Sequence, residues 1–177
     1  MVDAPLPQPE LVAAIPRLRR YARVLAGDAA RADDLVQETL ARAWEKRRLW
    51  QPGTDLRAWM FTIMHNVFVN QRNSAKREAA NVSLDADTEL SRSAWQVSVP
   101  PQQFTRVELN ELLRHVERLP VEQRETLLLA AVEEMKYEEI AMTLAVPVGT
   151  VMSRLSRARE KLRRMADERP AALKRVK

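Results

Sequence analysis

The chain has 177 residues, of which 46% are hydrophobic and 30% are charged, so it can form one or two small domains with a packed core. Its net charge is +5, and it contains no cysteine, which excludes disulfides and thiolate zinc sites. The only two histidines, His65 and His115, lie far apart in the sequence. We therefore expect neither a metal site nor a cofactor.

The ends and the charge distribution narrow the class of protein further. The N-terminal segment MVDAPLPQPE lacks the basic and apolar run of a signal peptide, and no apolar stretch approaches the roughly 18 residues that span a membrane. We expect a cytoplasmic protein without membrane insertion. Residues 137–177 contain ten Lys and Arg against five Asp and Glu, whereas 106–135 contain four against seven. This contrast predicts two different partner surfaces, with phosphate as the natural partner of the basic one.

The first part of the chain predicts three helices rich in Leu, Ala, Arg and Glu. Pro16 predicts a kink or a restart within the first helix, and the pair Gly27-Asp28 can end that helix and cap the next. The segment QPGTD at 51–55 has turn chemistry. The apolar stripes comprise Leu35, Val36, Leu40, Ala43 and Trp44 in the second helix and Met60, Ile63, Met64 and Val67 in the third. The three predicted helices span 10–26, 28–50 and 56–78.

The periodic pattern is lost over residues 79–104, where Ser, Asp, Asn and a Pro-Pro pair replace it. A segment of this length exceeds ordinary loops and predicts a flexible linker. The linker separates two small helical domains, so the expected fold class is all-α. The predicted domains are 8–78 and 105–169, with a basic tail at 170–177, and the helices of the second domain are predicted at 105–119, 121–135, 137–144 and 148–167.

The segment YEEIAMTLAVPVGTVMSRLSRA, residues 137–158, predicts a helix-turn-helix. Ile140 and Leu144 can face Val151 and Leu155 across the two helices, and Ala141 is small where crossing helices approach closely. Pro147 lies at the start of the second helix, where its missing N–H is harmless, and Ala145 occupies a turn position that usually prefers glycine. We therefore expect a helix-turn-helix with a slightly strained turn.

The rest of the second helix is basic and free to enter a DNA major groove. A solvated basic helix is the alternative, but the preceding helix and the turn favour DNA binding. We predict that Thr150, Met152, Ser153, Ser156 and Arg157 face base edges. We predict that Arg154, Arg159, Lys161 and Arg163 contact phosphates.

Three motifs in order resemble one family over nearly the whole chain. The segment YEEIAMTLAVPVGTVMSRLSRAREKLRR resembles conserved region 4 of bacterial RNA polymerase sigma factors of the extracytoplasmic-function (group IV) type. The segments ADDLVQETLARAWEKRRLW and LRAWMFTIMHNVFVNQRN resemble region 2 of the same family. Glu134 and Ala145 stand where this family often has glycine, and Met152 stands where a basic residue is common. These departures concern turn geometry and −35 base preference.

The resemblance implies a two-domain transcription initiation factor and not an enzyme. Such a factor binds core polymerase through the β′ clamp helices and the β flap, recognises the −10 and −35 promoter elements, and helps to melt the −10 region. It lacks regions 1.1 and 3 of larger sigma factors, takes part in stress responses, and is commonly held by an anti-sigma factor.

Residues alone leave the acidic stripe of the second helix open, since it could be solvated or could serve the helix dipole. The resemblance implies that this stripe docks on the β′ clamp helices, with Leu35 partly involved. Trp44 is expected in the core. The residues assigned to core polymerase binding are Asp34, Leu35, Gln37 and Glu38.

One side of the third helix gathers a tryptophan and asparagines, which are poor mid-helix residues but suit single-stranded bases. The resemblance implies −10 recognition here, whereas from the residues alone Trp59 could equally be core. The loop WQPGTD at 50–55 corresponds to a loop that captures a flipped base in the family. The residues assigned to the −10 element are Trp59, Thr62, Asn66, Asn70, Arg72, Lys76 and Arg77, and Asn73 shares the same side.

Two competing functions and one open question remain at this stage. A two-domain helix-turn-helix regulator would bind duplex DNA without polymerase. A nucleic-acid enzyme would need a carboxylate cluster for metal ions, and Asp33, Asp34 and Glu38 on one exposed helical face suit that poorly. The acids Asp85, Asp87 and Glu89 of the linker fit either mimicry of nascent RNA or a plain soluble tether.

Overall fold

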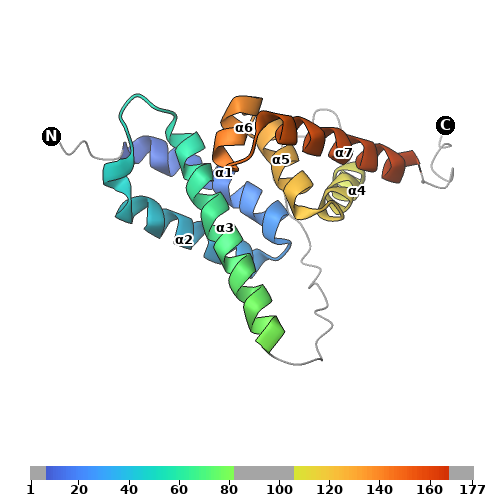
Figure 1. Ribbon diagram of the computed structural model, residues 1–177, viewed down its shortest axis with the longest axis horizontal. Helices are drawn as coiled ribbons and strands as arrows, with labels where there is room; N and C mark the ends of the chain where they lie inside the picture. Colours follow the sequence, from blue (N-terminus) through green and yellow to red (C-terminus); the bar gives the residue numbers. More distant parts are fainter. Residues whose placement is uncertain (1–6, 82–105, 168–177) are drawn as a thin grey trace. The chain divides into compact units, whose positions relative to one another are not determined.

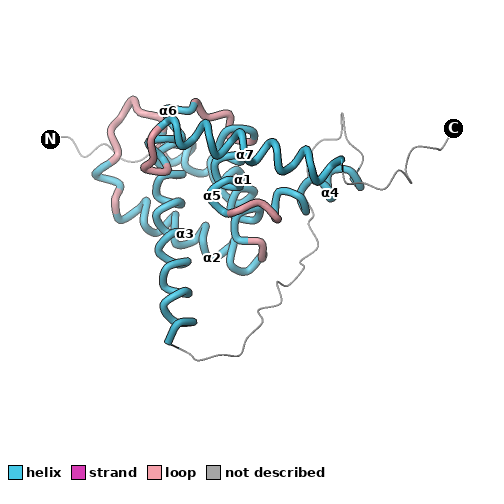
Figure 2. The backbone as a smooth tube through the Cα atoms, turned by 45° about the vertical axis from the view of Figure 1, so that its right-hand side comes forward, coloured by secondary structure: helices cyan, strands magenta, loops and turns pink. Residues whose placement is uncertain are grey.

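The structure is a computed structural model that describes residues 7–81 and 106–167. All regular structure in these two ranges is helical, which confirms the all-α prediction (Figure 2). The chain splits into two compact units, and the boundary along the sequence falls between Ala94 and Trp95. The acidic residues of the predicted linker and the predicted basic tail lie outside the described residues.

The first unit is a bundle of three helices, α1 (Gln8–Ala26), α2 (Ala29–Glu45) and α3 (Leu56–Asn81), with a short 3-10 helix η1 (Arg47–Leu49) after α2. Each of the three long helices packs against the other two. α3 is the longest, and its last turns project past α1 and α2 (Figure 1). It continues to Asn81, so three residues assigned to the linker belong to this helix.

The junction between α1 and α2 follows the predicted capping chemistry. Gly27 has a φ of 74° and donates its N–H to the Arg23 carbonyl, which is the left-handed geometry that glycine adopts without strain. Asp28 then caps α2 by accepting a hydrogen bond of 2.8 Å from the Ala30 N–H. The predicted restart at Pro16 is wrong, because α1 runs unbroken through it. Pro16 is exposed, so water can hydrate the carbonyl of the preceding turn that a proline leaves unbonded.

The core of this bundle is built from the predicted apolar stripes. Tyr21 of α1 packs edge-on against Phe61 of α3, with ring centroids 5.0 Å apart. Burying one large apolar side chain contributes about 1.5–3 kcal/mol, so these stripes dominate the stability of the bundle. Other members of the core are Leu18, Leu25, Leu35, Val36, Ala43, Met60, Ile63, Met64 and Val67.

Trp44 is not in the core, contrary to the prediction. Its side chain is 55% exposed, and the Arg47 guanidinium lies 5.0 Å from its ring centroid. The reason is angular: α2 buries Leu35, Thr39 and Ala43, and the next residue points about 100° away from that stripe. The helix also ends at Glu45, earlier than predicted, so no later turn covers the indole.

The helices after the boundary are α4 (Arg106–Glu117), α5 (Val121–Ala131), α6 (Tyr137–Thr143) and α7 (Val148–Asp167). Both α4 and α5 pack on α7. The α7 bounds agree with the predicted helix, whereas α5 ends four residues earlier than predicted. The residues after α5 form a turn in which Glu134 has a φ of 53°.

The predicted helix-turn-helix core is confirmed. Ile140 of α6 and Val151 of α7 are completely buried, and Ala141 of α6 is buried as well. Ala145 in the turn has a φ of 51°, so the expected strain is present at this residue. Two further buried residues, Leu144 and Leu155, complete the predicted set.

A partly buried arginine ties α4 to α5. The Arg124 guanidinium donates hydrogen bonds to the carbonyls of Glu117 and Leu119, at the C-terminal end of α4. Burial lowers the pKa of Arg124, and the negative charge of Glu117 opposes this shift. These bonds satisfy carbonyls that the end of a helix otherwise leaves unpaired.

Across 7–81 and 106–167 we find no helix with the length and apolarity needed to span a bilayer.

Candidate nucleic-acid interface

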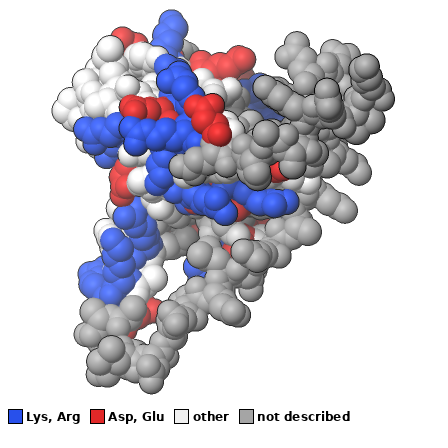
Figure 3. Space-filling model, turned by 90° about the vertical axis from the view of Figure 1, so that its right-hand side faces the viewer, with Lys and Arg blue, Asp and Glu red and all other residues white. Residues whose placement is uncertain are grey.

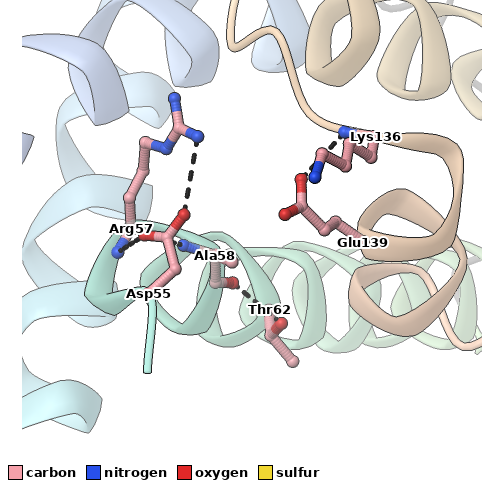
Figure 4. Close-up of polar contacts among 6 residues, drawn as sticks. All are labelled: Asp55, Arg57, Ala58, Thr62, Lys136 and Glu139. Atoms are coloured by element: carbon pink, nitrogen blue, oxygen red, sulfur yellow. Dashed lines mark hydrogen bonds and ion pairs between the residues drawn. The ribbon is translucent and has the colours of Figure 1, made fainter. Parts of the chain in front are cut away.

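The start of α7 is fixed by the turn that precedes it. The Pro147 carbonyl accepts the N–H groups of Thr150 at 2.9 Å and Val151 at 3.2 Å, which opens the helix. In front of the turn, the Glu139 carboxylate caps α6 by accepting the Lys136 N–H at 2.8 Å (Figure 4). Hydrogen bonds thus fix the start of each helix of the motif, and each helix has a buried apolar edge.

One edge of α7 is buried along Val151, Leu155 and Ala158, and the remaining circumference carries the predicted DNA-binding residues. At about 100° per residue these residues form two flanks of the helix. Met152, Ser156 and Arg159 lie on one flank and are exposed. Thr150, Arg154 and Lys161 lie on the other flank and are half-buried, with the exposed Arg157 and the half-buried Ser153 between the flanks.

The exposed cations of α7 are available to a ligand. Among the residues that the structure describes, Arg157, Arg159 and Arg163 form no ion pair. Arg164 is different, since it forms an ion pair with Glu160 one turn earlier, and its hydrogen bond lowers the pKa of that carboxyl. The positive charge that remains lies on the surface away from the buried edge.

A groove of about 320 Å³ lies between the start of α6 and the exposed flank of α7. Its apolar side is formed by Tyr137, Met152 and Leu155. Its polar side is formed by Ser156, Arg159, Glu160 and Arg163. The groove places a phenol and two unpaired arginines beside the predicted base-reading flank, a combination that suits phosphate and base contacts.

The N-terminus of α3 is capped by Asp55, whose carboxylate accepts the N–H groups of Arg57 at 2.8 Å and Ala58 at 3.3 Å (Figure 4). The Thr62 hydroxyl donates to the Ala58 carbonyl at 3.0 Å, so this predicted −10 residue bonds its own helix. Gly53 in the preceding loop has a φ of 89°, which a side chain would strain. The loop and the first turn of α3 therefore form a capped, defined structure.

Of the predicted −10 residues, Trp59, Thr62, Asn66 and Asn70 lie along one side of α3. Trp59 is half-buried, so it is neither plain core nor fully exposed, whereas Asn66, Asn70 and Asn73 are exposed. Arg72 is half-buried, and Lys76 and Arg77 are exposed near the end of the helix. The basic side chains of these last turns form the blue cluster just above the lowest grey segment in Figure 3.

The predicted polymerase-binding residues of α2 divide into three cases. Asp34 and Gln37 are exposed. Leu35 is 0% exposed, so its predicted direct role is corrected: it belongs to the core and supports the helix from below. Glu38 accepts a hydrogen bond of 2.8 Å from the Arg42 Nε. This bond, with the charges of Glu38 and Glu45, raises the pKa of Arg42.

A second groove, of about 360 Å³, lies between α2 and α3. It brings together Glu38 and Asn66, which the sequence assigned to different partners. The sequence alone did not predict this groove. It also did not predict that Trp44 shares the exposed side of α2 with Gln37, although residues spaced by seven lie on the same side of a helix. The full lining is Glu38, Arg42, Lys46, Ile63, Asn66, Val67, Asn70, Gln71 and Ser74.

The described residues hold no group of three or more His, Cys, Asp or Glu side chains arranged to bind a metal ion.

Comparison with known proteins gives matches to both domains. Residues 11–65 match the family model described as the Sigma2 domain of PhyR, and residues 109–162 match the model described as Sigma-70, region 4. The chain is 40% identical over 153 residues to the ECF RNA polymerase sigma factor EcfG of Rhodopseudomonas palustris, covering 86% of this chain and 81% of the relative. It is 34% identical to the ECF RNA polymerase sigma factor SigL of Mycobacterium tuberculosis, covering 82% and 80%.

Two solved structures resemble this chain over most of its length. One is the sigma factor RpoE in complex with the anti-sigma factor NepR from Bartonella quintana, with a TM-score of 0.74, 31% identity, and coverage of 92% of this chain and 98% of that one. The other is CnrH in complex with the cytosolic domain of CnrY, with a TM-score of 0.62, 26% identity, and coverage of 91% and 88%.

Proposed function

The chain belongs to the extracytoplasmic-function family of RNA polymerase sigma factors, and from this premise we propose how its two domains divide promoter recognition. As an alternative sigma factor it binds core RNA polymerase and directs promoter-specific initiation, so the alternative of a polymerase-independent regulator is set aside. A sigma factor is an initiation factor and not an enzyme. We further propose that it acts in the cytoplasm, where core polymerase is found.

The −35 element is read by α7. The observation that carries this proposal is the exposed, unpaired cationic surface of α7 opposite a fully buried edge. A helix of this kind fits the major groove, with Met152 and Ser156 toward base edges and Arg159 toward phosphate. Arg157 can reach a guanine, an interaction that discriminates by about 1–3 kcal/mol.

The −10 element is read as a separated strand by α3 and the loop before it. The half-buried Trp59 offers part of its ring for stacking, and the exposed amides of Asn66 and Asn70 offer both donors and acceptors to base edges. Arg72, Lys76 and Arg77 follow toward the end of the helix, where they suit the phosphates of the upstream DNA.

Core polymerase docks on the exposed side of α2. Asp34 and Gln37 remain in this surface, Leu35 supports it from the core, and Trp44 joins it. An indole that is 55% exposed, on the same side of the helix as Gln37, is typical of an interface hot spot. The acidic charge of Asp34 favours the basic β′ clamp helices as the partner of this surface. By family resemblance, we propose that the second domain binds the β flap.

A Trp44→Ala variant tests this docking surface. We expect about tenfold weaker binding to core polymerase by fluorescence titration, because an exposed aromatic contributes mainly to a partner. The thermal midpoint should change little, since more than half of the residue is exposed and the indole interacts with the exposed end of the helix through Arg47. A Leu49→Ala variant, also at an exposed apolar residue, is the control, and equal binding by wild type and the Trp44 variant would contradict the assignment.

An anti-sigma factor is a further proposed partner. It is supported by the RpoE structure, in which that sigma factor is in complex with NepR. The exposed side of α2 and the basic surface of α7 are the surfaces such a partner would need to cover. Binding of an anti-sigma factor should therefore compete with core polymerase for the Trp44 side of α2.

Run-off transcription tests the proposed function as a whole. Purified chain and core polymerase are incubated with genomic fragments, and the transcript start sites are mapped. We expect discrete starts that share sequence elements near −10 and −35, and core alone should give none of them. A chain that binds duplex DNA but leaves the start sites of core polymerase unchanged would contradict the proposal.

A further inference from the structure

The groove between α2 and α3 has two unlike walls and an apolar floor. The wall from α2 carries two cations, Arg42 and Lys46, and one acid, Glu38. The wall from α3 carries uncharged hydrogen-bonding groups, and the floor is formed by the buried Ile63 and Val67. Those uncharged groups are the side chains of Asn66, Asn70, Gln71 and Ser74.

The two cations are positioned for a ligand in different ways. Arg42 uses its Nε to bond Glu38 at 2.8 Å, while its Nη1 is 3.9 Å from Glu45. The Nη2 nitrogen, which takes part in neither of these ion pairs, therefore keeps donors for a further acceptor. Lys46 forms no ion pair within the described residues, and it is exposed at the end of α2. The net charge of the groove lining is thus +1 before any ligand enters, from two cations and one acid.

The chemistry of this lining favours one strand of nucleic acid. An arginine fork and an ammonium bind phosphate, amides bind base edges, and an apolar floor accepts the flat surface of a base. A volume of about 360 Å³ is at the small end of ligand sites, so it suits a single nucleotide and not a duplex. Asn66 and Asn70 belong both to this groove and to the proposed −10 reading side, so a strand on α3 is continuous with the groove.

We propose that the groove between α2 and α3 binds a phosphodiester of single-stranded DNA, with Arg42 and Lys46 as phosphate ligands supplied by α2. The proposal rests on the proposed −10 reading by α3 and adds a second helix to it. Glu38 then acts as a positioning residue, because it holds Arg42 over the groove through the bond to its Nε. This role differs from the polymerase contact that the sequence assigned to Glu38.

The first test compares binding of a single-stranded −10 oligonucleotide by holoenzymes made with wild type or with an Arg42→Gln, Lys46→Gln double variant. We expect about tenfold weaker binding at low salt. The dependence of the logarithm of affinity on the logarithm of salt should fall by about 0.7, because the one phosphate that the two cations neutralise contributes about 0.7 in a single strand. Arg31→Gln is the matched control, since it removes an exposed arginine of the same helix far from the groove. Unchanged affinity and unchanged salt dependence in the double variant would overturn the proposal.

The second test separates the two roles of Glu38. A Glu38→Gln variant should bind the strand about threefold more weakly, with a larger relative loss for the strand than for core polymerase. Arg42→Lys should also bind the strand more weakly than wild type, because lysine lacks the guanidinium fork. Loss of core binding with intact strand binding would overturn the positioning role. An Asn66→Ala, Asn70→Ala double variant distinguishes the groove proposal from the proposed −10 reading by α3. If this variant abolishes strand binding and the Arg42, Lys46 variant does not, −10 reading by α3 stands and the groove proposal is wrong.

Discussion

Helices α3 and α7 both carry a polar side next to a buried apolar one, but the polar groups differ in kind. α7 presents arginines without ion pairs on a helix whose seam is fully buried. α3 presents asparagines and a half-buried tryptophan, and apart from Arg57, which pairs with Asp55, its cations lie in its later turns. Intact duplex offers phosphates and a groove edge, whereas a separated strand offers base faces and their pairing edges. The two helices therefore have the chemistry of two different states of one promoter.

Reversing charge on α7 should have the largest effect on promoter-specific initiation, and it tests the difference between α7 and α3 most directly. In an Arg157→Glu, Arg159→Glu double variant we expect promoter-specific initiation to fall more than about a hundredfold, because two attractive interactions become repulsive. The salt dependence of binding to −35 duplex should fall as well, by about 0.9 for each phosphate that is no longer neutralised. Run-off transcription and duplex titration measure both.

Arg164→Glu provides the control for that variant. Arg164 is on the same helix but is already paired with Glu160, so its reversal should cost initiation far less. If the two variants reduced initiation equally, the effect would come from the total charge of the domain and not from a defined reading surface.

Replacing the amides of α3 should give a smaller and less salt-dependent loss. For Asn66→Ala with Asn70→Ala we expect about tenfold weaker binding of the −10 strand, since each stacking or hydrogen-bonding interaction that is removed contributes about 1 kcal/mol or slightly more. Neutral interactions release no counterions, so the salt dependence should stay as in wild type. A salt dependence that fell as much as in the α7 variant would remove the distinction between the two helices.

Gly149 in the first turn of α7 tests how closely DNA approaches the start of this helix. A Cβ built on it would meet nothing within 4 Å, so the fold does not require glycine there. We expect Gly149→Ala to stabilise the C-terminal domain by up to about 0.5 kcal/mol through helix propensity. Binding of −35 duplex should weaken by about fivefold, because the methyl group keeps the helix N-terminus from the backbone of the DNA. Thermal unfolding and duplex titration report the two opposite signs, and a variant that gained stability and kept its affinity would show that DNA does not approach here.

The sequence predicted α7 and its seam well because Val151, Leu155 and Ala158 recur at helical spacing within one short segment. It failed at Trp44 because size and hydrophobicity were weighed above angle, and the position lies off the buried stripe of α2. For Leu35 the reason is the opposite. The family motif assigned this residue to polymerase binding, although the apolar stripe of α2 already predicted that it is buried. The groove holding Arg42 could not be found, because its walls come from helices whose register is set only by tertiary packing.

The smallest effect is expected in the turn that aims α7. Ala145 has a φ of 51°, a left-handed conformation that strains any residue with a Cβ by roughly 1 kcal/mol or more. Ala145→Gly should therefore stabilise the C-terminal domain by about 0.5 kcal/mol, after subtracting the larger backbone entropy that glycine has when unfolded. Hydrogen exchange in α6 and α7 should show the same increase in the free energy of opening, and the thermal midpoint of that domain should rise by a few degrees. Ala166→Gly, within regular helix, should instead lower stability by about half a kcal/mol. If both variants destabilised the domain, the turn would not be under strain, and its shape would be set by the buried seam alone.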